Sequence, residues 1–310
     1  MKKLYIIGNG FDRYHGLPTS YECFNCFMCR EHPEEHEKIG RVFDSKDTTM
    51  LWSDFENKLG ELDISGLIYR NLSAWAKEPL HKFENEFDDL YNKLVLYFQE
   101  WVKQINMACA NSKRLELDKT AYYLNFNYTE TLEYLYRLDK TQILYIHNKI
   151  NKDSDLVPIF GHGKNNSDVS KFVHENSAVI KNRIVESQQM PSWEDTIDGF
   201  EEEIVHEIST FLNDLRKKTE EIIDKKPFFS EKQGPSFDDI FVLGHSLAEV
   251  DLPYFEKIAC KSPNAKWHVS YRDDDLRDLK RIAENICKIP YATNVKLITL
   301  DKLRVNNDNA

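Results

Sequence analysis

Short apolar runs that favour β-structure alternate along this chain with stretches of helical periodicity, and this alternation constrains the fold more than any other feature. The runs cover residues 4–7, 122–126, 142–146, 156–160, 239–243, 267–271 and 295–300. Strands that alternate with helices pair as a parallel sheet whose two faces are covered by helices. The sequence therefore predicts the α/β class, with a Rossmann-like parallel sheet flanked by helices.

Two long segments between these runs have the character of helical insertions. Residues 83–107 carry apolar side chains at helical spacing, which predicts one long helix. Residues 165–233 are highly charged, and apolar residues over 200–222 predict a second long amphipathic helix. The acidic run 201–203 is expected to be a solvated face, with partner docking as the alternative. We predict one α/β domain over residues 1–310, with insertions at about 40–118 and about 165–235.

Charge and hydropathy argue against two broad classes of protein, general nucleic-acid binders and membrane-spanning proteins, although a local basic patch is still compatible with the composition. The net charge of -11 and the pI of about 5.5 disfavour general binding to nucleic acid, because the average surface repels phosphate groups. No apolar run approaches the roughly eighteen residues that a membrane span requires. We therefore expect a soluble cytoplasmic protein that does not bind membranes.

The six cysteines are read as free thiols of a reducing compartment. Cys109, Cys260 and Cys287 lie in predicted helices, where they are expected to pack as small apolar groups. The motif Cys23-x-x-Cys26-x-x-Cys29, followed by His32 and His36, superficially resembles a metal site. Phe24, Phe27 and Met28 interleave with these cysteines in one predicted helix, which favours packing. Zinc binding, which would need a second pair of ligands, is the alternative.

Glycines follow the first predicted strand in the sequence Gly8-Asn9-Gly10-Phe11-Asp12. Glycine allows a sharp turn and a close approach of the backbone to a ligand. A loop of this kind at the carboxyl edge of a sheet is a common site for a nucleotide phosphate. A tight turn without any ligand is the alternative interpretation.

Polar residues also follow three other predicted strands. Asn127 follows the strand at 122–126, His147 follows 142–146, and Gly244-His245-Ser246 follows 239–243, with Asp251 a little further on. In a parallel sheet these ends share one edge, so the polar groups are expected to line one pocket. A structural imidazole is the alternative for His147, and Thr129 with Glu130 has helix capping as its alternative.

Two further residues have less distinctive surroundings. Glu56 lies within the segment that carries the apolar stripe of Trp52, Phe55 and Leu59, and a solvated surface carboxylate is favoured over one that faces a cleft. His162 lies in a glycine-histidine turn after the predicted strand 156–160.

The motifs form a recognisable set when they are taken together. The set consists of Ile6-Ile7-Gly8-Asn9-Gly10-Phe11-Asp12, His15-Gly16-Leu17-Pro18-Thr19-Ser20-Tyr21, Trp52-x-x-Phe55-Glu56, Phe126-Asn127-Tyr128-Thr129, Phe160-Gly161-His162-Gly163 and Leu243-Gly244-His245-Ser246 with Asp251. This set, spread over most of the chain, resembles the AbiH family of bacterial phage abortive-infection proteins. AbiH proteins in turn resemble, distantly, the sirtuin-like NAD-binding domains of antiphage NADases.

The resemblance implies a role for individual residues. Gly8, Asn9 and Gly10, with Phe11 and Asp12, would lie near a pyrophosphate. Asn127 would hold the nicotinamide ribose or the attacking water, and His147 would act as a general base or orient a hydroxyl group. Gly244, His245, Ser246 and Asp251 would complete the nucleotide site. Asn148 stands where a sirtuin has glycine, Asp12 replaces a small hydroxyl residue, and the two Cys-x-x-Cys pairs of the sirtuin zinc ribbon are absent.

The expected function is that of an antiphage abortive-infection effector that binds NAD, or a related nucleotide, and hydrolyses its N-glycosidic bond without a metal. The first alternative is a metal-dependent nuclease or phosphodiesterase, with ligands Asp12, His162, His245 and Asp251. The second alternative is a sensor that binds a nucleotide or a phage protein without turnover. A phage-derived trigger and a homo-oligomer are partners that the sequence leaves open.

Overall fold

In the described part of the chain, six strands form one parallel sheet, which confirms the predicted α/β, Rossmann-like class. The strands are β1 (Lys3–Ile7), β2 (Tyr122–Asn125), β3 (Ile143–Tyr145), β4 (Asp239–Leu243), β5 (Lys266–Ser270) and β6 (Val295–Ile298). Their order in the sheet is β3-β2-β1-β4-β5-β6. The strand order therefore reverses between β1 and β4, which is where open parallel sheets bind ligands.

This computed structural model describes residues 1–42, 52, 55–59, 81–163, 171, 173–179, 182, 202, 205–206, 208–273 and 275–305. The chain divides into two compact units. The first unit, which contains the sheet, comprises Met1–Cys23, Gln99–Ile159 and Lys218–Ala310. The second unit comprises Phe24–Phe98 and Phe160–Lys217. The helical insertions at about 40–118 and about 165–235 stay predictions.

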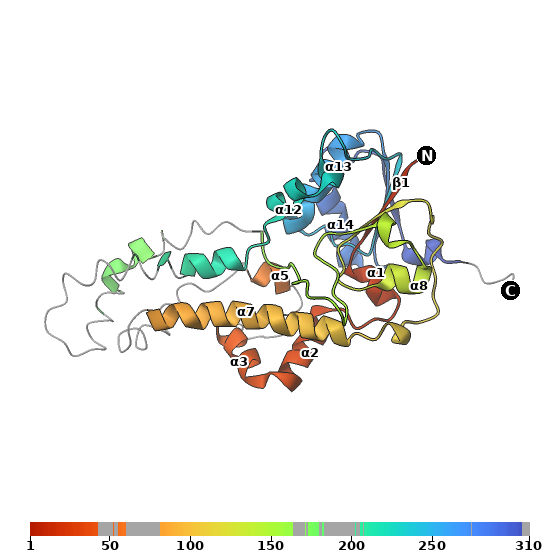
Figure 1. Ribbon diagram of the computed structural model, residues 1–310. Coiled ribbons are helices and arrows are strands. Elements are labelled where there is room, and N and C mark those ends of the chain that lie inside the picture. The colour runs from red at the N-terminus through yellow and green to blue at the C-terminus, as the bar shows by residue number, and fades with distance from the viewer. Residues whose placement is uncertain are drawn as a thin grey trace. The chain divides into compact units, whose positions relative to one another are not determined.

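Helices connect the strands of the first unit (Figure 1). They are α1 (Asn9–Tyr14), η1 (Met107–Cys109), α8 (Thr131–Tyr136), η2 (Lys140–Gln142), α12 (Thr219–Lys225), η3 (Pro227–Phe229), η4 (Glu249–Asp251), α13 (Leu252–Lys261), α14 (Leu276–Ile286) and η5 (Leu300–Leu303). The second unit contains α3 (Pro33–Val42) and α5 (Phe55–Lys58). Helices α2 (Tyr21–Glu31) and α7 (His81–Gln104) each contribute residues to both units.

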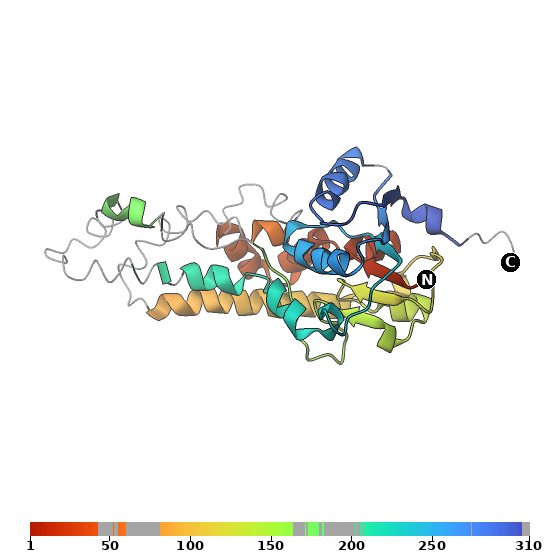
Figure 2. The same cartoon turned by 90° about the horizontal axis from the view of Figure 1, so that it is seen from above.

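Helices cover both faces of the sheet. Leu4 and Ile6 of β1 share a core with residues of α12, α13 and α14, whereas Tyr5 and Ile7 share a core with residues of α1 and α8. Figure 2 shows β1 and α1, in red, beside the yellow-green segment that contains α8. Because successive strand side chains point to opposite faces, a strand covered on both sides must be apolar throughout. This explains the uninterrupted apolar run at the start of the chain.

Two predicted elements differ from the structure. The predicted strand 156–160 has no regular structure, since Pro158 lacks an N–H and Leu156 and Val157 are exposed. The predicted long helix over 200–222 is also wrong where it is described: residues 208–214 are helical, and α12 begins separately at Thr219. Between them, Leu215 and Lys217 exchange backbone hydrogen bonds with His162, and this pairing ends the helix. Phe200 and Ile204 of that pattern lie outside the described residues.

The cysteines occupy surface positions rather than the packed positions predicted for them. Cys109, Cys260 and Cys287 are exposed free thiols. The single helix predicted for the Cys-x-x-Cys-x-x-Cys motif is confirmed as α2, but Cys26 and Cys29 are exposed and Cys23 is half-buried. Larger apolar side chains fill the buried face of α2 instead, namely Phe24, Phe27 and Met28. Within the described ranges, no three His, Cys, Asp or Glu side chains are close enough to hold a metal ion.

Glu56 is not the solvated surface carboxylate that its sequence context predicts. Its Oε2 lies 2.7 Å from Nζ of Lys217, whose side chain is 0% exposed. The ammonium group of a lysine this deeply buried requires a carboxylate nearby to offset its loss of hydration. Glu56 therefore has a structural role within the second unit.

Candidate functional site

The loops that follow β1 and β4 contact each other where the strand order reverses. The N–H of Gly8 donates to the Leu243 carbonyl at 3.0 Å, and that of Gly10 donates to the Gly244 carbonyl at 2.7 Å. A Cβ atom on Gly8 would lie 2.5 Å from Cα of His245, so glycine is required for this approach. The N–H of Phe11 donates to the Gly8 carbonyl at 2.9 Å. These three amides bind protein carbonyls, and the predicted phosphate contact of Gly8 and Gly10 stays a prediction.

Asn127 connects the loop after β2 to the loop after β1. Its Nδ2 donates to the Gly8 carbonyl at 3.1 Å, and its backbone N–H donates to Oδ1 of Asn125 at 3.0 Å. In the neighbouring turn, Thr19 donates its hydroxyl to Oδ1 of Asn9 at 2.5 Å. Asn127 is buried, so one of its functions is to hold two strand ends in register.

Asp12 is a carboxyl group enclosed between the same two loops, with 1% of its surface exposed. Thr129 donates its hydroxyl to Oδ2 of Asp12, and Thr129 and Thr131 are hydrogen-bonded to each other at 3.0 Å. Oδ1 of Asp12 has no hydrogen-bond partner. Thr129 therefore binds a carboxyl group instead of capping α8, whose N-cap residue is Glu130.

Burial raises the pKa of Asp12 from 3.8 to about 6, and the hydroxyl groups of Thr129 and Thr131 and the amide of Asn127 oppose this rise. The folded protein therefore binds this proton more tightly than the unfolded chain does. Between about pH 4 and pH 6 the contribution of Asp12 to the free energy of unfolding falls as the pH rises. At neutral pH, ionisation of the buried Asp12 carboxyl group lowers the free energy of unfolding by about 3 kcal/mol.

We expect Asp12→Asn to remove this cost, because an amide of the same shape cannot ionise. The variant should be more stable than the wild type by about 1 to 3 kcal/mol at about pH 7.5, with no gain at about pH 4. Urea denaturation of both proteins at the two pH values measures the difference. A pH-independent difference would contradict the assignment.

Asp118→Asn provides a control of opposite sign. Hydrogen bonds from Thr120 and Lys3 lower the pKa of Asp118 from 3.8 to about 2. Its charge therefore stabilises the fold above this range, and that contribution is lost as the pH falls toward about 2. Asp118→Asn should accordingly be less stable than the wild type at neutral pH.

His147 lies directly beyond β3 with 3% of its surface exposed. Its Nδ1 lies 3.2 Å from the Phe126 carbonyl oxygen, and its ring makes an edge contact with the Phe126 ring. Because a carbonyl oxygen only accepts hydrogen bonds, Nδ1 carries a proton and Nε2 is the nitrogen that can act as a base. Nε2 of His147 lies 3.8 Å from Oδ1 of Asp251.

His245 approaches the same carboxylate from the loop after β4. Its Nε2 lies 3.5 Å from Oδ2 of Asp251. The N–H of Leu247 donates to Nδ1 of His245 at 2.9 Å. The structure thus places His147, His245 and Asp251 together, all three buried, at the edge where the sequence predicted one pocket.

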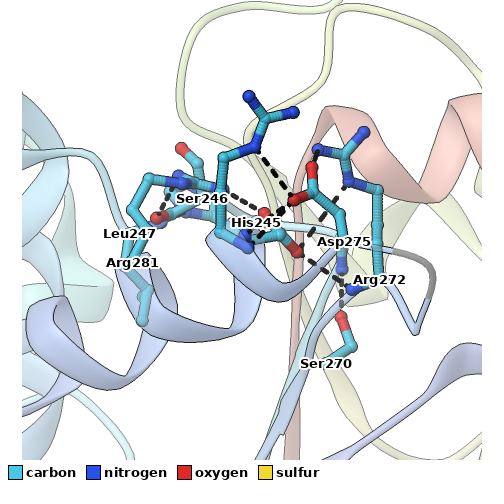
Figure 3. Close-up of polar contacts among 10 residues, drawn as sticks. His245, Ser246, Leu247, Ser270, Arg272, Asp275 and Arg281 are labelled. Carbon is cyan, nitrogen blue, oxygen red and sulfur yellow. Dashed lines mark hydrogen bonds and ion pairs between the residues drawn. The ribbon is translucent and has the colours of Figure 1, made fainter.

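The rest of this loop is held by residues of β5 and α14 (Figure 3). The N–H of Gly244 donates to Oγ of Ser270 at 2.7 Å, and Nη1 of Arg281 donates to the Ser246 carbonyl at 2.9 Å. Arg281 also pairs with Asp278, which accepts a hydrogen bond from the N–H of Arg272 at 2.9 Å. Ser246 is half-buried, so part of it is accessible at the surface.

Sequence reasoning missed several members of this edge. Ser270 had a signal, since it lies next to the end of a predicted strand, but Arg281 is an exposed residue of α14 that no sequence pattern distinguishes. His162, a ligand in the alternative metal site, belongs to the second unit. There its Nε2 lies 3.0 Å from the Leu212 carbonyl oxygen.

Comparison with known proteins identifies a family for most of the chain. The family model described as Bacteriophage abortive infection AbiH matches residues 4–271. No curated protein and no solved structure matches the chain. In the ranges that the structure describes, no helix is long and apolar enough to cross a membrane.

Proposed function

This chain belongs to the AbiH family and has an antiphage abortive-infection role, and from this premise we propose that it binds NAD or a related nucleotide and hydrolyses the N-glycosidic bond. The observation that carries the proposal is the gathering of His147, Asn127 and the two glycine loops at the edge where the strand order reverses. Crevices at such edges are where doubly wound sheets bind nucleotides.

In the proposed site, different loops bind different parts of the NAD molecule. Gly8, Asn9 and Gly10, with Phe11 and Asp12, lie toward the pyrophosphate, and Gly244, His245 and Ser246 contact a phosphate or a ribose hydroxyl. Asn127 orients the nicotinamide ribose or the attacking water. The distant resemblance of the AbiH motifs to sirtuin-like NAD-binding domains supports this division. Asp251, which the resemblance also assigns to the nucleotide site, lies closest to the two imidazoles.

The chemistry requires few groups, because the charged pyridinium ring of NAD is already a good leaving group. Water attacks C1′ of the ribose as the bond between C1′ and the ring nitrogen breaks, and nicotinamide leaves with the bonding electrons as a neutral molecule. His147 accepts a proton from the water at Nε2, the ring nitrogen opposite the Nδ1 that contacts the Phe126 carbonyl. Polar groups held in fixed orientations at the carboxyl edge of the sheet stabilise the positive charge that develops on the ribose.

The test is incubation of the purified protein with NAD, with and without EDTA, followed by chromatography of nicotinamide and ADP-ribose. Release of both products that survives EDTA is the expected result. No release of nicotinamide, together with cleavage of nucleic acid or of another phosphodiester when magnesium or manganese is added, would favour the metal-dependent nuclease or phosphodiesterase. NAD binding by calorimetry without any release, including after addition of phage lysate as a trigger, would favour a sensor.

A further inference from the structure

Asp251 lies between two imidazoles that come from different strand ends. His147 follows β3, His245 follows β4, and Asp251 ends the short helix η4. Each carboxylate oxygen faces one ring: Oδ1 lies 3.8 Å from Nε2 of His147, and Oδ2 lies 3.5 Å from Nε2 of His245. The three side chains are at most 8% exposed, so the charge of the carboxylate is only weakly screened by solvent.

The two imidazoles differ in how their protons are placed. The N–H of Leu247 donates to Nδ1 of His245, so this nitrogen presents a lone pair. The ring proton of His245 is then on Nε2, and His245 is neutral, because an imidazolium has no lone pair to accept with. His245 consequently directs an N–H toward Oδ2 of Asp251 without adding a second positive charge to the cluster.

His147 has the opposite arrangement. Its Nδ1 donates to the Phe126 carbonyl, which leaves Nε2 facing Oδ1 of Asp251. When Nε2 accepts a proton, the ring becomes a cation beside a buried carboxylate, and this pairing favours the charged form. Because His245 is neutral, the negative charge of Asp251 stabilises a positive charge on His147 alone of the two imidazoles.

We infer that Asp251 is a positioning residue that, held by His245, stabilises the imidazolium formed on His147 and makes no contact with the nucleotide. The inference rests on the proposed function and changes the part played by His245 and Asp251 in it. The proton moves from the attacking water to Nε2 of His147 as the bond between water oxygen and C1′ forms. Asp251 keeps its charge throughout this step.

Asp251→Asn tests the inference by kinetics, since it keeps the shape and removes the charge. The rate constant kcat for NAD hydrolysis should fall by about 10²-fold while KM changes by less than about twofold. A raised KM with an unchanged kcat would overturn the inference, because it would place Asp251 in contact with the substrate. Asp239→Asn is the matched control, since Asp239 pairs with His268 at 3.2 Å and should leave both constants unchanged.

Nitrogen NMR of the imidazole rings provides a readout that needs no turnover. In the free wild-type protein, Nδ1 of His245 should have the chemical shift of an unprotonated ring nitrogen. As the pH is lowered, Nε2 of His147 should become protonated at a lower pH in Asp251→Asn than in the wild type, and Asp239→Asn should affect only His268. A protonated Nδ1 on His245, or the same pH of protonation for His147 in Asp251→Asn and the wild type, would overturn the inference even if the wild type released no nicotinamide.

Discussion

Gly244→Ala is expected to destabilise the protein by about 3 to 5 kcal/mol, enough to deplete the folded state of a typical domain. Gly244 has a φ of +66°, a conformation that costs an L-residue with a side chain roughly 1 to 2 kcal/mol. The new Cβ would also lie 2.1 Å from the backbone nitrogen of Phe11. Relief of this clash would require the loops after β1 and β4 to separate. Urea denaturation measures the loss.

Gly16→Ala is the matched control for this prediction. Gly16 also has a positive φ, +79°, but the nearest atom to its Cβ would be Nδ2 of Asn111 at 3.2 Å, at the end of a flexible side chain. We therefore expect a loss of only about 1 to 2 kcal/mol, from backbone strain alone. Equal losses in the two alanine variants would show that the contact between the two loops is not what requires Gly244.

His147→Gln is expected to lower the rate of NAD hydrolysis by about 10²-fold to 10⁴-fold, the usual contribution of a general base. Glutamine fills most of the space of the imidazole, and its amide N–H can still donate to the Phe126 carbonyl. It cannot accept the proton of the attacking water at neutral pH. Nicotinamide release under saturating NAD, with the thermal unfolding midpoint of each protein, measures the effect.

His268→Gln separates this catalytic effect from the general effect of losing a histidine. His268 stacks on Phe241 within the sheet and pairs with Asp239, so it reproduces a histidine-carboxylate pair away from the carboxyl ends of the strands. The His268→Gln variant should hydrolyse NAD at the wild-type rate. Wild-type hydrolysis by His147→Gln would exclude His147 as the base.

Sequence reasoning reached the fold class because the signals for it are local. The β-prone runs and the helical spacing each extend over a few residues, and their alternation predicted the parallel sheet that is observed. The run 156–160 has the same composition as a strand, yet it forms none. Its proline cannot donate to a neighbouring strand, and its exposed apolar residues do not face a core.

The site was predicted in part for the same reason. Residues directly after a strand, such as Asn127 and His147, are assigned to the carboxyl edge by their position in the sequence alone. Position in the sequence does not assign the partners of the site residues in this way. Asp12 binds Thr129, and Asp251 faces His147, each across more than a hundred positions of sequence. No local pattern indicates such a pair. Glu56 illustrates the same limit, because its partner Lys217 is also remote in the sequence and the general exposure of glutamate favoured a surface position.

By itself, the sequence determined that this protein is an α/β protein whose strand ends carry glycine, asparagine and histidine, because backbone propensity and side-chain periodicity act over short distances. Only the tertiary structure decided the strand order and its reversal between β1 and β4. It also decided where protons lie at the site. The carbonyl of Phe126 and the N–H of Leu247 select the protonated nitrogen of each imidazole, and burial sets the charge of Asp12. These properties depend on which groups from distant parts of the chain are brought together away from water.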